Sequence, residues 1–539
     1  MPRDLDALRR DPFDVLVVGG GIHGLFAAYD AAQRGLRVAL VDRDDFGAGL
    51  TFNHQRTIHG GLRALETGHL VRTRRLIAER RTWALIAPHL LRPLPFLIGT
   101  YRFSRRSRWA IRAGFRLYDV IGRARNRGIS PELHLPRAKL ESAAATRRLF
   151  PGVAERGLTG GAVWYDYQLT HPDRLTWTVA LAARQAGAEL HNHVEAVGPL
   201  DSGGRPGGAR VRDVLTGAEA DVRASVVLLA PGSRLGPVMA RFGLPGAPPM
   251  LRAMNLLLDR PARDIATVAP GPTGRVLTSV PWAGRVLVGT HQSPAPIEPG
   301  DAAPPAEAVE AFLREANETF PRLEATARDL RMVHHGLTPA VVRGNGADLM
   351  PESRVIRGPN GGVVAVVGVK LTTARLTAAA AVDAVCRDLP GARGRCRTAE
   401  APLPHAGIAD VEGRVIETAR GLGVTLDRDI VAHLAGWYGT EAADVVGFAA
   451  SRGMLDRLTP DVPVLAAEIA YAAGHAQAAR LADAVLRRTP LGAAGHPGRP
   501  ALERAAAVMS GELGWSADRA ADELRAVEQV YDVRTALRA

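Results

Sequence analysis

A glycine pattern between an apolar strand and a helix constrains this chain more than any other feature. Gly-x-Gly-x-x-Gly occupies residues 19–24, directly after the apolar run 14–18, and a second apolar run, 37–41, ends beside Asp42. In dinucleotide-binding folds the first glycine permits a tight turn, the second admits a pyrophosphate, and the third lets helix and strand pack closely. An acid at the end of the second strand accepts hydrogen bonds from ribose hydroxyls. The pattern predicts a βαβ unit whose cofactor-binding residues are Gly19, Gly20, Gly21, Gly24 and Asp42.

This unit does not decide between NAD and FAD as the dinucleotide. Two later apolar runs, 226–229 and 363–367, each end in a glycine turn, and the second turn carries Lys370. Both runs can return the chain to the same cofactor, or both can be ordinary strands of the core. The residues alone leave these alternatives open.

Size and charge narrow the class of protein. A chain of 539 residues indicates two or three packed units, and its formal net charge of +13 favours an anionic partner, although the arginine richness throughout also fits a coding bias. The two cysteines, Cys386 and Cys396, have neither paired spacing nor a histidine cluster beside them, so we expect no disulfide framework and no metal site. No apolar run reaches membrane-spanning length, and we expect a cytoplasmic protein.

Strand and helix patterns alternate along most of the chain. Residues 63–125 read as helical and arginine-rich, whereas 157–281 alternates β-branched runs with glycine turns and includes a hairpin tip at 201–208. After the proline-containing segment 400–407 the sequence becomes rich in alanine and leucine with helical periodicity. We therefore predict a separate helical cap at 408–539.

Several separate segments resemble the FAD-dependent (aerobic-type) glycerol-3-phosphate dehydrogenase family. Ile-His-Gly-Gly-Leu-Arg at 58–63 and Gly-Val-Lys-Leu-Thr-Thr at 368–373 are similar to two of its conserved motifs. Further similar segments lie at 87–93, 471–475 and 486–489. The resemblance implies an enzyme that holds FAD, oxidises C2 of glycerol 3-phosphate to give dihydroxyacetone phosphate, and passes electrons to quinone at a membrane.

The resemblance also implies the fold. It is an α/β protein with a FAD-binding Rossmann-type domain of the glutathione-reductase-like kind, an antiparallel-sheet substrate domain and a C-terminal all-helical cap. We expect an oxidoreductase region at 1–400 and the helical domain at 408–539. Within the first region, the FAD-binding elements are expected at about 12–75, 155–235 and 355–395, and the substrate elements at about 76–154 and 236–354.

Further cofactor contacts follow from the resemblance alone. Val194 is expected against the adenine, and residues 45–51 are expected around the phosphate side of the flavin. Because no cysteine lies near the flavin-facing motifs, we expect non-covalent FAD. The implied additional cofactor-binding residues are Thr51, Val194, Ala230, Gly232, Gly368, Lys370, Leu371 and Thr372.

The expected substrate pocket keeps some of the family's residues and loses others. Arg63 and Lys370 are kept, and Arg354 is a looser match, so three cations remain for a phosphate or another anion. Thr338 stands where the family has an arginine, Asn255 where it has a histidine, and Gln292 where it has an acid.

These losses leave the catalytic base and the substrate open. An asparagine cannot accept the hydroxyl proton, so His59 and His291 are the candidate bases. The expected catalytic residues are Arg63, Lys370 and His59. A second hypothesis keeps FAD and the fold but acts on another anionic alcohol or amine. A third is a flavin-binding protein without catalysis. The oligomeric state stays open.

The segment 101–127 carries nine arginines interleaved with aromatic and aliphatic residues. This composition is typical of a helix lying in a membrane interface, and it predicts binding to an anionic membrane surface on the cytoplasmic side. The alternative is an arginine-coated helix whose apolar side packs on the protein core. We do not expect nucleic acid as a partner, because no recognised module accompanies the charge.

Overall fold

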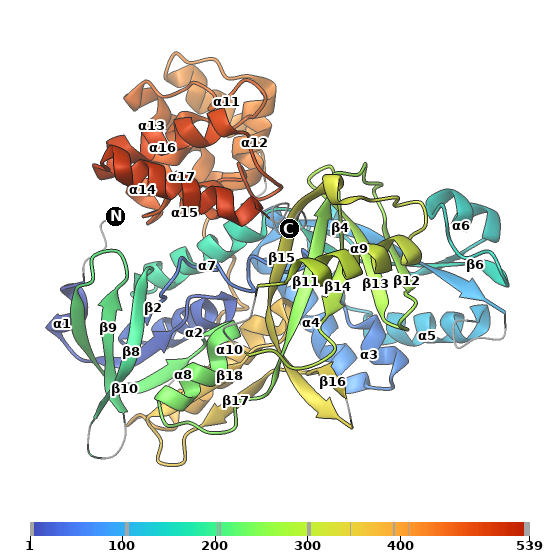
Figure 1. The fold of residues 1–539 in the computed structure, drawn as a ribbon, viewed down its shortest axis with the longest axis horizontal. Helices are drawn as coiled ribbons and strands as arrows, with labels where there is room; N and C mark the ends of the chain where they lie inside the picture. The colour runs from blue at the N-terminus through green and yellow to red at the C-terminus, as the bar shows by residue number, and fades with distance from the viewer. Residues whose placement is uncertain are drawn as a thin grey trace.

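Two β-sheets lie side by side beneath a helical cap in the computed structural model of this chain (Figure 1). The cap, in orange and red, covers one end of the first sheet's helical layer. The structure describes residues 5–102, 107–201, 203, 206–298, 303–344, 346–391, 394–407 and 409–532. The predicted combination of an FAD-type α/β fold, a second sheet and a C-terminal helical domain is confirmed.

The first sheet is the predicted dinucleotide-binding sheet. Its strand order is β17-β18-β10-β1-β2-β7, with all neighbours parallel except β17 and β18. Strand β10 continues into a hairpin layer with β8 and β9, as the turn signal at 201–208 predicted. The bounds are β1 Phe13–Val18, β2 Val38–Val41, β7 Glu189–His191, β8 Val194–Asp201, β9 Pro206–Asp213, β10 Glu219–Leu229, β17 Arg354–Arg357 and β18 Val363–Val367.

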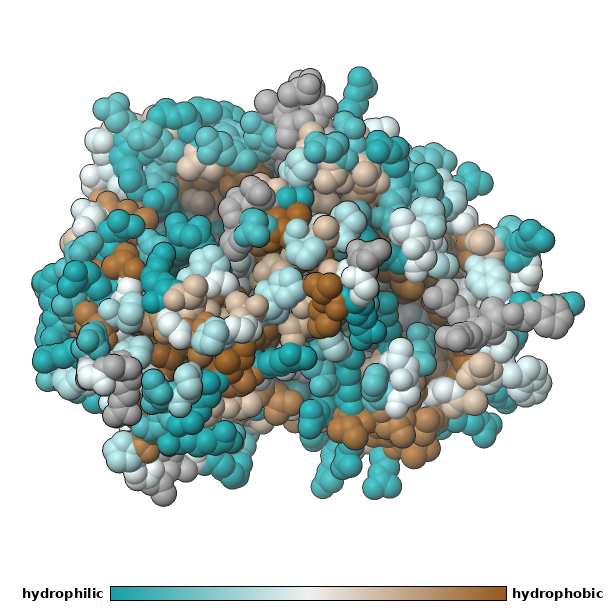
Figure 2. Space-filling model, turned by 60° about the horizontal axis from the view of Figure 1, so that its bottom comes forward, coloured by the Kyte–Doolittle hydropathy of each residue, from teal (hydrophilic) through white to brown (hydrophobic). Residues whose placement is uncertain are grey.

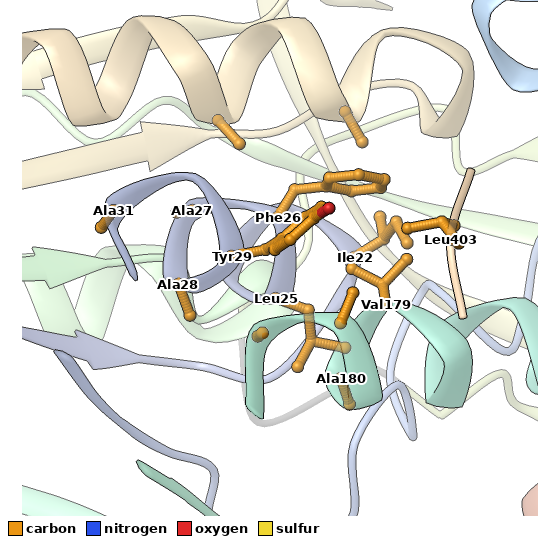
Figure 3. Close-up of a cluster of buried hydrophobic side chains, with 14 of the residues drawn as sticks. Ile22, Leu25, Phe26, Ala27, Ala28, Tyr29, Ala31, Val179, Ala180 and Leu403 are labelled. Atoms are coloured by element: carbon orange, nitrogen blue, oxygen red, sulfur yellow. The ribbon is translucent and has the colours of Figure 1, made fainter. Parts of the chain in front are cut away.

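Alternating side chains of β1 explain why this sheet is covered on both faces. Val15 and Val17 face a helical layer, whereas Leu16 and Val18 face the hairpin layer, and all four are buried. Figure 3 shows the helical side, where apolar residues of α2 pack against α7 and Leu403. The helices around this sheet are α1 Ala7–Arg10, α2 Ile22–Gln33, α7 Pro172–Gln185, α8 Leu235–Arg241 and α10 Ala374–Cys386.

The second sheet is almost wholly antiparallel, and only β12 and β4 run parallel. Its order is β16-β15-β11-β14-β13-β12-β4-β6-β3, with β5 paired to β6. Strands β3 and β6 belong to this sheet although their residues fall in segments expected among the FAD-binding elements. The bounds are β3 Thr57–Ile58, β4 Leu91–Tyr101, β5 Lys139–Glu141, β6 Leu158–Leu169, β11 Met250–Leu258, β12 Ala266–Pro270, β13 Val276–Trp282, β14 Arg285–Gln292, β15 Leu330–Arg343 and β16 Gly346–Leu349.

The interpretation of 63–125 as helical throughout was wrong at β4. This eleven-residue strand pairs with β6 along its whole length, and its apolar residues Leu94 and Phe96 are buried. Tertiary pairing therefore outweighs the helical pattern of the flanking residues. The surrounding helices are α3 Leu62–Glu66, α4 Leu70–Ile86, α5 Arg108–Ile121, α6 Ala143–Leu149 and, farther along the chain, α9 Ala306–Thr319.

The C-terminal cap is helical, as its periodicity predicted. Two apolar clusters form its interior, one around Trp437 and the other around Met509. Its helices are α11 Val411–Gly421, α12 Arg428–Tyr438, α13 Ala442–Arg452, α14 Ala466–His475, α15 Leu481–Asp483, the π-helical turn η8 Ala484–Arg488, α16 Arg499–Leu513 and α17 Ala517–Tyr531.

Candidate functional site

The carboxyl ends of four strands of the first sheet meet at one edge. In the parallel register Val18 of β1 stands beside Val41 of β2 and Leu229 of β10, and Leu229 stands beside Ala365 of β18. The glycine turn, Asp42, the turn that holds Ala230 and Gly232, and the segment 368–373 therefore leave the sheet together. In open α/β sheets this edge is where ligands bind.

The glycine turn has the close approaches that its sequence predicted. Gly19 has φ +109°, and a Cβ there would lie 2.3 Å from the carbonyl oxygen of Ala230. A Cβ on Gly24 would lie 1.9 Å from the carbonyl oxygen of Gly19, so only glycine lets α2 come this near to β1. Gly21 differs, because the nearest atom to its Cβ position is the Thr51 hydroxyl at 3.3 Å. The open side of the turn thus lies above Gly21, at the N-terminus of α2.

Asp42 lies beneath this turn. Its carboxylate accepts hydrogen bonds from the backbone N–H groups of Gly20 at 2.5 Å and Asp44 at 2.8 Å. Burial raises the pKa of Asp42 to about 7, although both hydrogen bonds oppose the shift. Val194 begins β8 and is buried, and its N–H donates to the Asp42 carbonyl at 2.7 Å. Val194 therefore lies beside Asp42, where an adenosine would be held.

At the same edge of the sheet, the segment 368–373 that follows β18 contacts the motif at 58–63. The N–H of His59 donates to the Thr372 hydroxyl at 3.2 Å, and the Trp83 indole donates to the Thr372 carbonyl at 2.9 Å. A Cβ on Gly368 would lie 2.6 Å from the His23 ring, so the segment passes directly over the start of α2. The Leu371 side chain packs at the edge of the main core.

The residues of this edge fit FAD. The space above Gly21 is open to a pyrophosphate, and a partly buried acid, Asp42, stands where the ribose hydroxyls would lie. The buried Nε2 of His23, whose ring lies against Gly368, has no hydrogen-bond partner among the described residues. Unpaired buried polar atoms are uncommon in folded proteins, and a bound water, ion or ligand can account for one.

His59 has a carboxylate behind its ring. Nδ1 lies 3.6 Å from Asp166 Oδ2, Nε2 lies 2.8 Å from the Thr57 hydroxyl, and about half of the side chain is exposed. Asp166 is buried and paired with Arg80, and it accepts the Gly60 N–H at 2.7 Å. Burial alone would raise the pKa of Asp166, but Arg80 and His59 lower it. The Asp166 carboxylate therefore stays ionised beside the His59 ring.

Two of the predicted cations lie together, with a third that sequence reasoning missed. Lys370 Nζ donates to the Pro351 carbonyl at 2.8 Å, and Arg72 donates to the same oxygen at 2.5 Å. Burial, aided by the Arg72 and Arg63 cations, lowers the pKa of Lys370 to about 8. Arg63 is exposed on α3. Arg354 is exposed at the start of β17, opposite Val367, and among the described residues no hydrogen bond or ion pair of its side chain joins it to this cluster.

Asn255 and Thr338 both lie on the second sheet but at different places. Asn255 is buried on β11, accepts the Thr290 hydroxyl at 2.9 Å and donates to the Asn53 carbonyl at 3.2 Å. It pairs with His334 of β15, whereas Thr338 pairs with Leu251, four residues farther along the ladder. Four residues of strand span about 13 Å. The Asn255 amide is therefore engaged by the protein itself.

The second candidate base, His291, is held by a carboxylate on α9. Its Nδ1 lies 2.9 Å from Glu315 Oε2 and 2.9 Å from the Arg275 guanidinium, and burial lowers its pKa. Gln292 follows at the end of β14, opposite Ala253. This tether favours a structural role for His291, and His59 is the better placed of the two histidines.

Helix α5, in the basic segment 101–127, has one apolar side packed on the protein and another that is exposed. Phe115 and Tyr118 are buried, whereas Trp109, Leu117 and Val120 are 79%, 42% and 69% exposed along the opposite side. On the face of the molecule drawn in Figure 2, apolar side chains gather in several places among hydrophilic ones, so exposed apolar groups are not confined to α5. Of the three arginines of this segment expected to bind lipid, Arg105 and Arg106 lie outside the described residues, and Arg108 donates to the carbonyls of Glu141 and Thr159 instead. In the part of the chain that the structure describes, no helix has the length and apolar character needed to cross a bilayer.

Comparisons with known proteins agree with this architecture. Residues 14–384 match the FAD dependent oxidoreductase family, and residues 391–520 match the C-terminal domain of alpha-glycerophosphate oxidase. The chain is 31% identical to glycerol-3-phosphate dehydrogenase 2 of Mycobacterium bovis, over 95% of this chain and 86% of the relative. It is 28% identical to glycerol-3-phosphate dehydrogenase of Synechocystis, over 96% of both chains.

A solved structure supports the fold over nearly the whole chain. The glycerol-3-phosphate dehydrogenase of Bacillus halodurans, complexed with FAD, superimposes with a TM-score of 0.74 at 20% identity. The match covers 98% of this chain and 96% of that one. These likenesses establish FAD as the cofactor and an oxidoreductase as the class of protein.

Proposed function

Because this chain belongs to the FAD-dependent glycerol-3-phosphate dehydrogenase family, we propose that it oxidises glycerol 3-phosphate to dihydroxyacetone phosphate. The observation that carries the proposal is the contact between the motif at 58–63 and the turn at 368–373. The His59 N–H reaches Thr372, and Lys370 shares the Pro351 carbonyl with Arg72. A candidate base and a cation cluster thus border the edge at which the cofactor would lie.

The mechanism assigns one task to each group. Arg63, Arg72 and Lys370 would hold the phosphate, because guanidinium and ammonium groups bind oxyanions through charge-assisted hydrogen bonds. His59 would accept the proton of the C2 hydroxyl at one of its ring nitrogens, with Asp166 stabilising the resulting imidazolium. FAD, held by the glycine turn and Asp42, would supply the acceptor for the hydride that leaves C2. Arg80 acts through Asp166 and keeps that carboxylate ionised.

We further propose that electrons leave to quinone at an anionic membrane surface. The exposed side of α5 supports this, because Trp109, Leu117 and Val120 are apolar while Arg112 and Arg116 of the same helix are exposed. An aromatic and aliphatic strip flanked by cations suits the boundary between headgroups and acyl chains. The chain would then work on the cytoplasmic side of the membrane.

A second candidate function keeps FAD but changes the substrate to another anionic alcohol or amine. It is favoured by Thr338 and Asn255, which replace the arginine and histidine that the family carries at the matching positions. The Asn255 amide is moreover already hydrogen-bonded to Asn53 and Thr290, so it has little capacity left to bind a substrate.

Anaerobic mixing distinguishes the two functions. The holoenzyme is mixed with glycerol 3-phosphate, and bleaching of the flavin absorbance reports hydride transfer without any electron acceptor. Rapid bleaching supports the first function, whereas bleaching only by other polyol phosphates or amines supports the second. His59→Asn should slow bleaching by ~100-fold or more while the protein stays yellow. His291→Asn is the matched control. If bleaching is slowed in His291→Asn and not in His59→Asn, the catalytic base is His291.

A further inference from the structure

A single buried carboxylate joins the helical cap to the cofactor cradle. Asp45 follows β2, and its side chain is fully buried. Oδ2 accepts from Arg487 Nε at 2.6 Å and Arg488 Nη1 at 2.8 Å, while Oδ1 accepts from Arg488 Nη2 at 2.6 Å and Asn192 at 2.9 Å. Both arginines come from the cap, more than 440 residues away in sequence. Four donors therefore converge on one ion.

The local geometry of the cap makes this convergence possible. Consecutive residues of an α-helix point about 100° apart, so two adjacent arginines rarely reach one carboxylate. Here Arg487 and Arg488 end the π-helical turn η8, and Thr489 is already extended. Single π-helical turns are frequently found at functional sites. The turn thus directs both guanidinium groups to Asp45.

Each arginine is also fixed on its other side. Arg487 donates to Asp483 at 2.7 Å, and Arg488 donates to the Ala476 carbonyl at 2.8 Å and lies 4.7 Å from the centre of the Trp177 ring on α7. Asp483 in turn lies 2.8 Å from His193 Nε2. Asp45, His193 and Asp483 are close enough to hold a metal ion, but the two guanidinium groups already neutralise the two carboxylates.

The segment that carries Asp45 lies on the glycine turn. Gly47 N–H donates to the Gly20 carbonyl at 3.0 Å, and the Thr51 hydroxyl accepts the Ile22 N–H at 3.0 Å. Any displacement of 42–51 would therefore move the groups that surround the open space above Gly21. Apart from Asn192, the side chains that hold the Asp45 carboxylate belong to the cap.

We propose that Arg487 and Arg488 are positioning residues for FAD, which clamp segment 42–51 against the glycine turn and so couple docking of the cap to retention of the cofactor. This inference goes beyond the proposed reaction, and it rests only on FAD lying on the glycine turn. Linkage makes the coupling reciprocal: if the clamp tightens FAD binding, FAD must equally tighten docking of the cap.

Affinity measurements test the clamp. Arg488→Lys keeps the positive charge but loses the planar fork, and it should raise the Kd of the apoprotein for FAD about 10-fold or more. Arg174→Lys is the matched control, because Arg174 is also buried, pairs with Glu441 of the cap and lies 4.9 Å from the Tyr438 ring. Among the described residues, no hydrogen bond or ion pair joins it to 42–51. An unchanged Kd in Arg488→Lys, or an equal rise in both variants, overturns the proposal.

Hydrogen exchange tests the clamp on the wild-type protein, so the result does not depend on whether a variant folds. FAD added to the apoprotein should slow amide exchange at 476–489 as well as at 42–51, while exchange at 411–421 on the far part of the cap stays unchanged. Protection of 42–51 without protection of 476–489 overturns the clamp. Gly21→Val separates this failure from a misplaced cofactor: if that variant binds FAD normally, the glycine turn is not the FAD site.

Discussion

The pH dependence of FAD binding tests the proposed role of Asp42. Burial raises the pKa of this carboxyl to about 7, and its ionised form accepts N–H bonds from Gly20 and Asp44. An ionised carboxylate accepts hydrogen bonds from ribose hydroxyls at both oxygens, whereas the protonated acid offers fewer acceptor sites. FAD should therefore bind the ionised form more tightly, and binding below neutral pH should release a proton.

The size of the effect follows from that pKa. With a pKa of about 7 the ionised fraction rises from about 3% at pH 5.5 to about 75% at pH 7.5, so affinity should rise roughly 25-fold. The stability of the apoprotein should change in the opposite sense. Between pH 3.8 and about 7 the folded chain keeps a proton that the unfolded chain has lost, so rising pH lowers the free energy of unfolding, by at most about 4 kcal/mol.

Titration of the apoprotein with FAD at pH 5.5, 6.5 and 7.5, followed by flavin fluorescence, gives the Kd at each pH. Asp42→Asn cannot ionise and should bind FAD weakly with little pH dependence. Asp44→Asn is the control, because it keeps the backbone N–H that bonds Asp42 and removes only a nearby charge that raises the Asp42 pKa; the pH dependence should persist and move to lower pH. A flat Kd in the wild type, or the same slope in Asp42→Asn, would refute the reasoning.

Two further predictions concern the substrate and the membrane. Burial lowers the pKa of Lys370 to about 8, so KM for an anionic substrate should rise as the pH passes 8. Lys370→Arg should move that rise to higher pH. If KM depends on pH in the same way in the wild type and in this variant, Lys370 has no role in anion binding. Trp109→Ser combined with Val120→Ser should reduce co-sedimentation with anionic liposomes, and salt should weaken the binding that remains, whereas Leu513→Ser on the cap should have no effect. Equal co-sedimentation of all three proteins would mean that α5 does not contact lipid.

The cofactor edge could be predicted from the sequence because its signals are local. The glycines, the strands beside them and Asp42 lie within 30 residues, and their spacing reflects backbone geometry that few other residues permit. Strand β4 could not be predicted in the same way. Pro93 and Pro95 obscure its alternation, and its place between β6 and β12 depends on residues far along the chain.

The parts of the site that were missed depend on contacts between distant segments. Arg72 reaches the Pro351 carbonyl 279 residues away, and nothing in its neighbourhood distinguishes it from the other arginines of α4. The pairing of Asp45 with Arg488 spans 443 residues. A signal did exist for the second case, because two adjacent arginines inside an apolar helical segment must find buried partners. The sequence alone could not say which carboxylates these were.

The altered pocket residues lead to the last prediction. Thr338 removes one charge-assisted hydrogen bond that an arginine would supply, which is worth about 1.5–3 kcal/mol, or roughly 10- to 150-fold in affinity. Asn255 removes a titratable ring, which would slow proton transfer by ~100-fold or more unless His59 serves as the base. Because the two positions lie four residue pairs apart on β11 and β15 and share no hydrogen-bond partner among the described residues, their effects should be nearly additive.

We therefore expect Thr338→Arg to lower KM for glycerol 3-phosphate and Asn255→His to raise kcat, with the double variant combining both gains. Asn255→His must also give up the bonds to Asn53 and Thr290, so thermal unfolding of each variant should be measured alongside its kinetics. Arg63→Ala should abolish turnover in either background, because it removes a cation that the pocket retains. If the wild type already oxidises glycerol 3-phosphate rapidly and the double variant is no better, Thr338 and Asn255 do not mark a changed substrate. The cation cluster of Arg63, Arg72 and Lys370 would then suffice for the phosphate, and His59 for the proton.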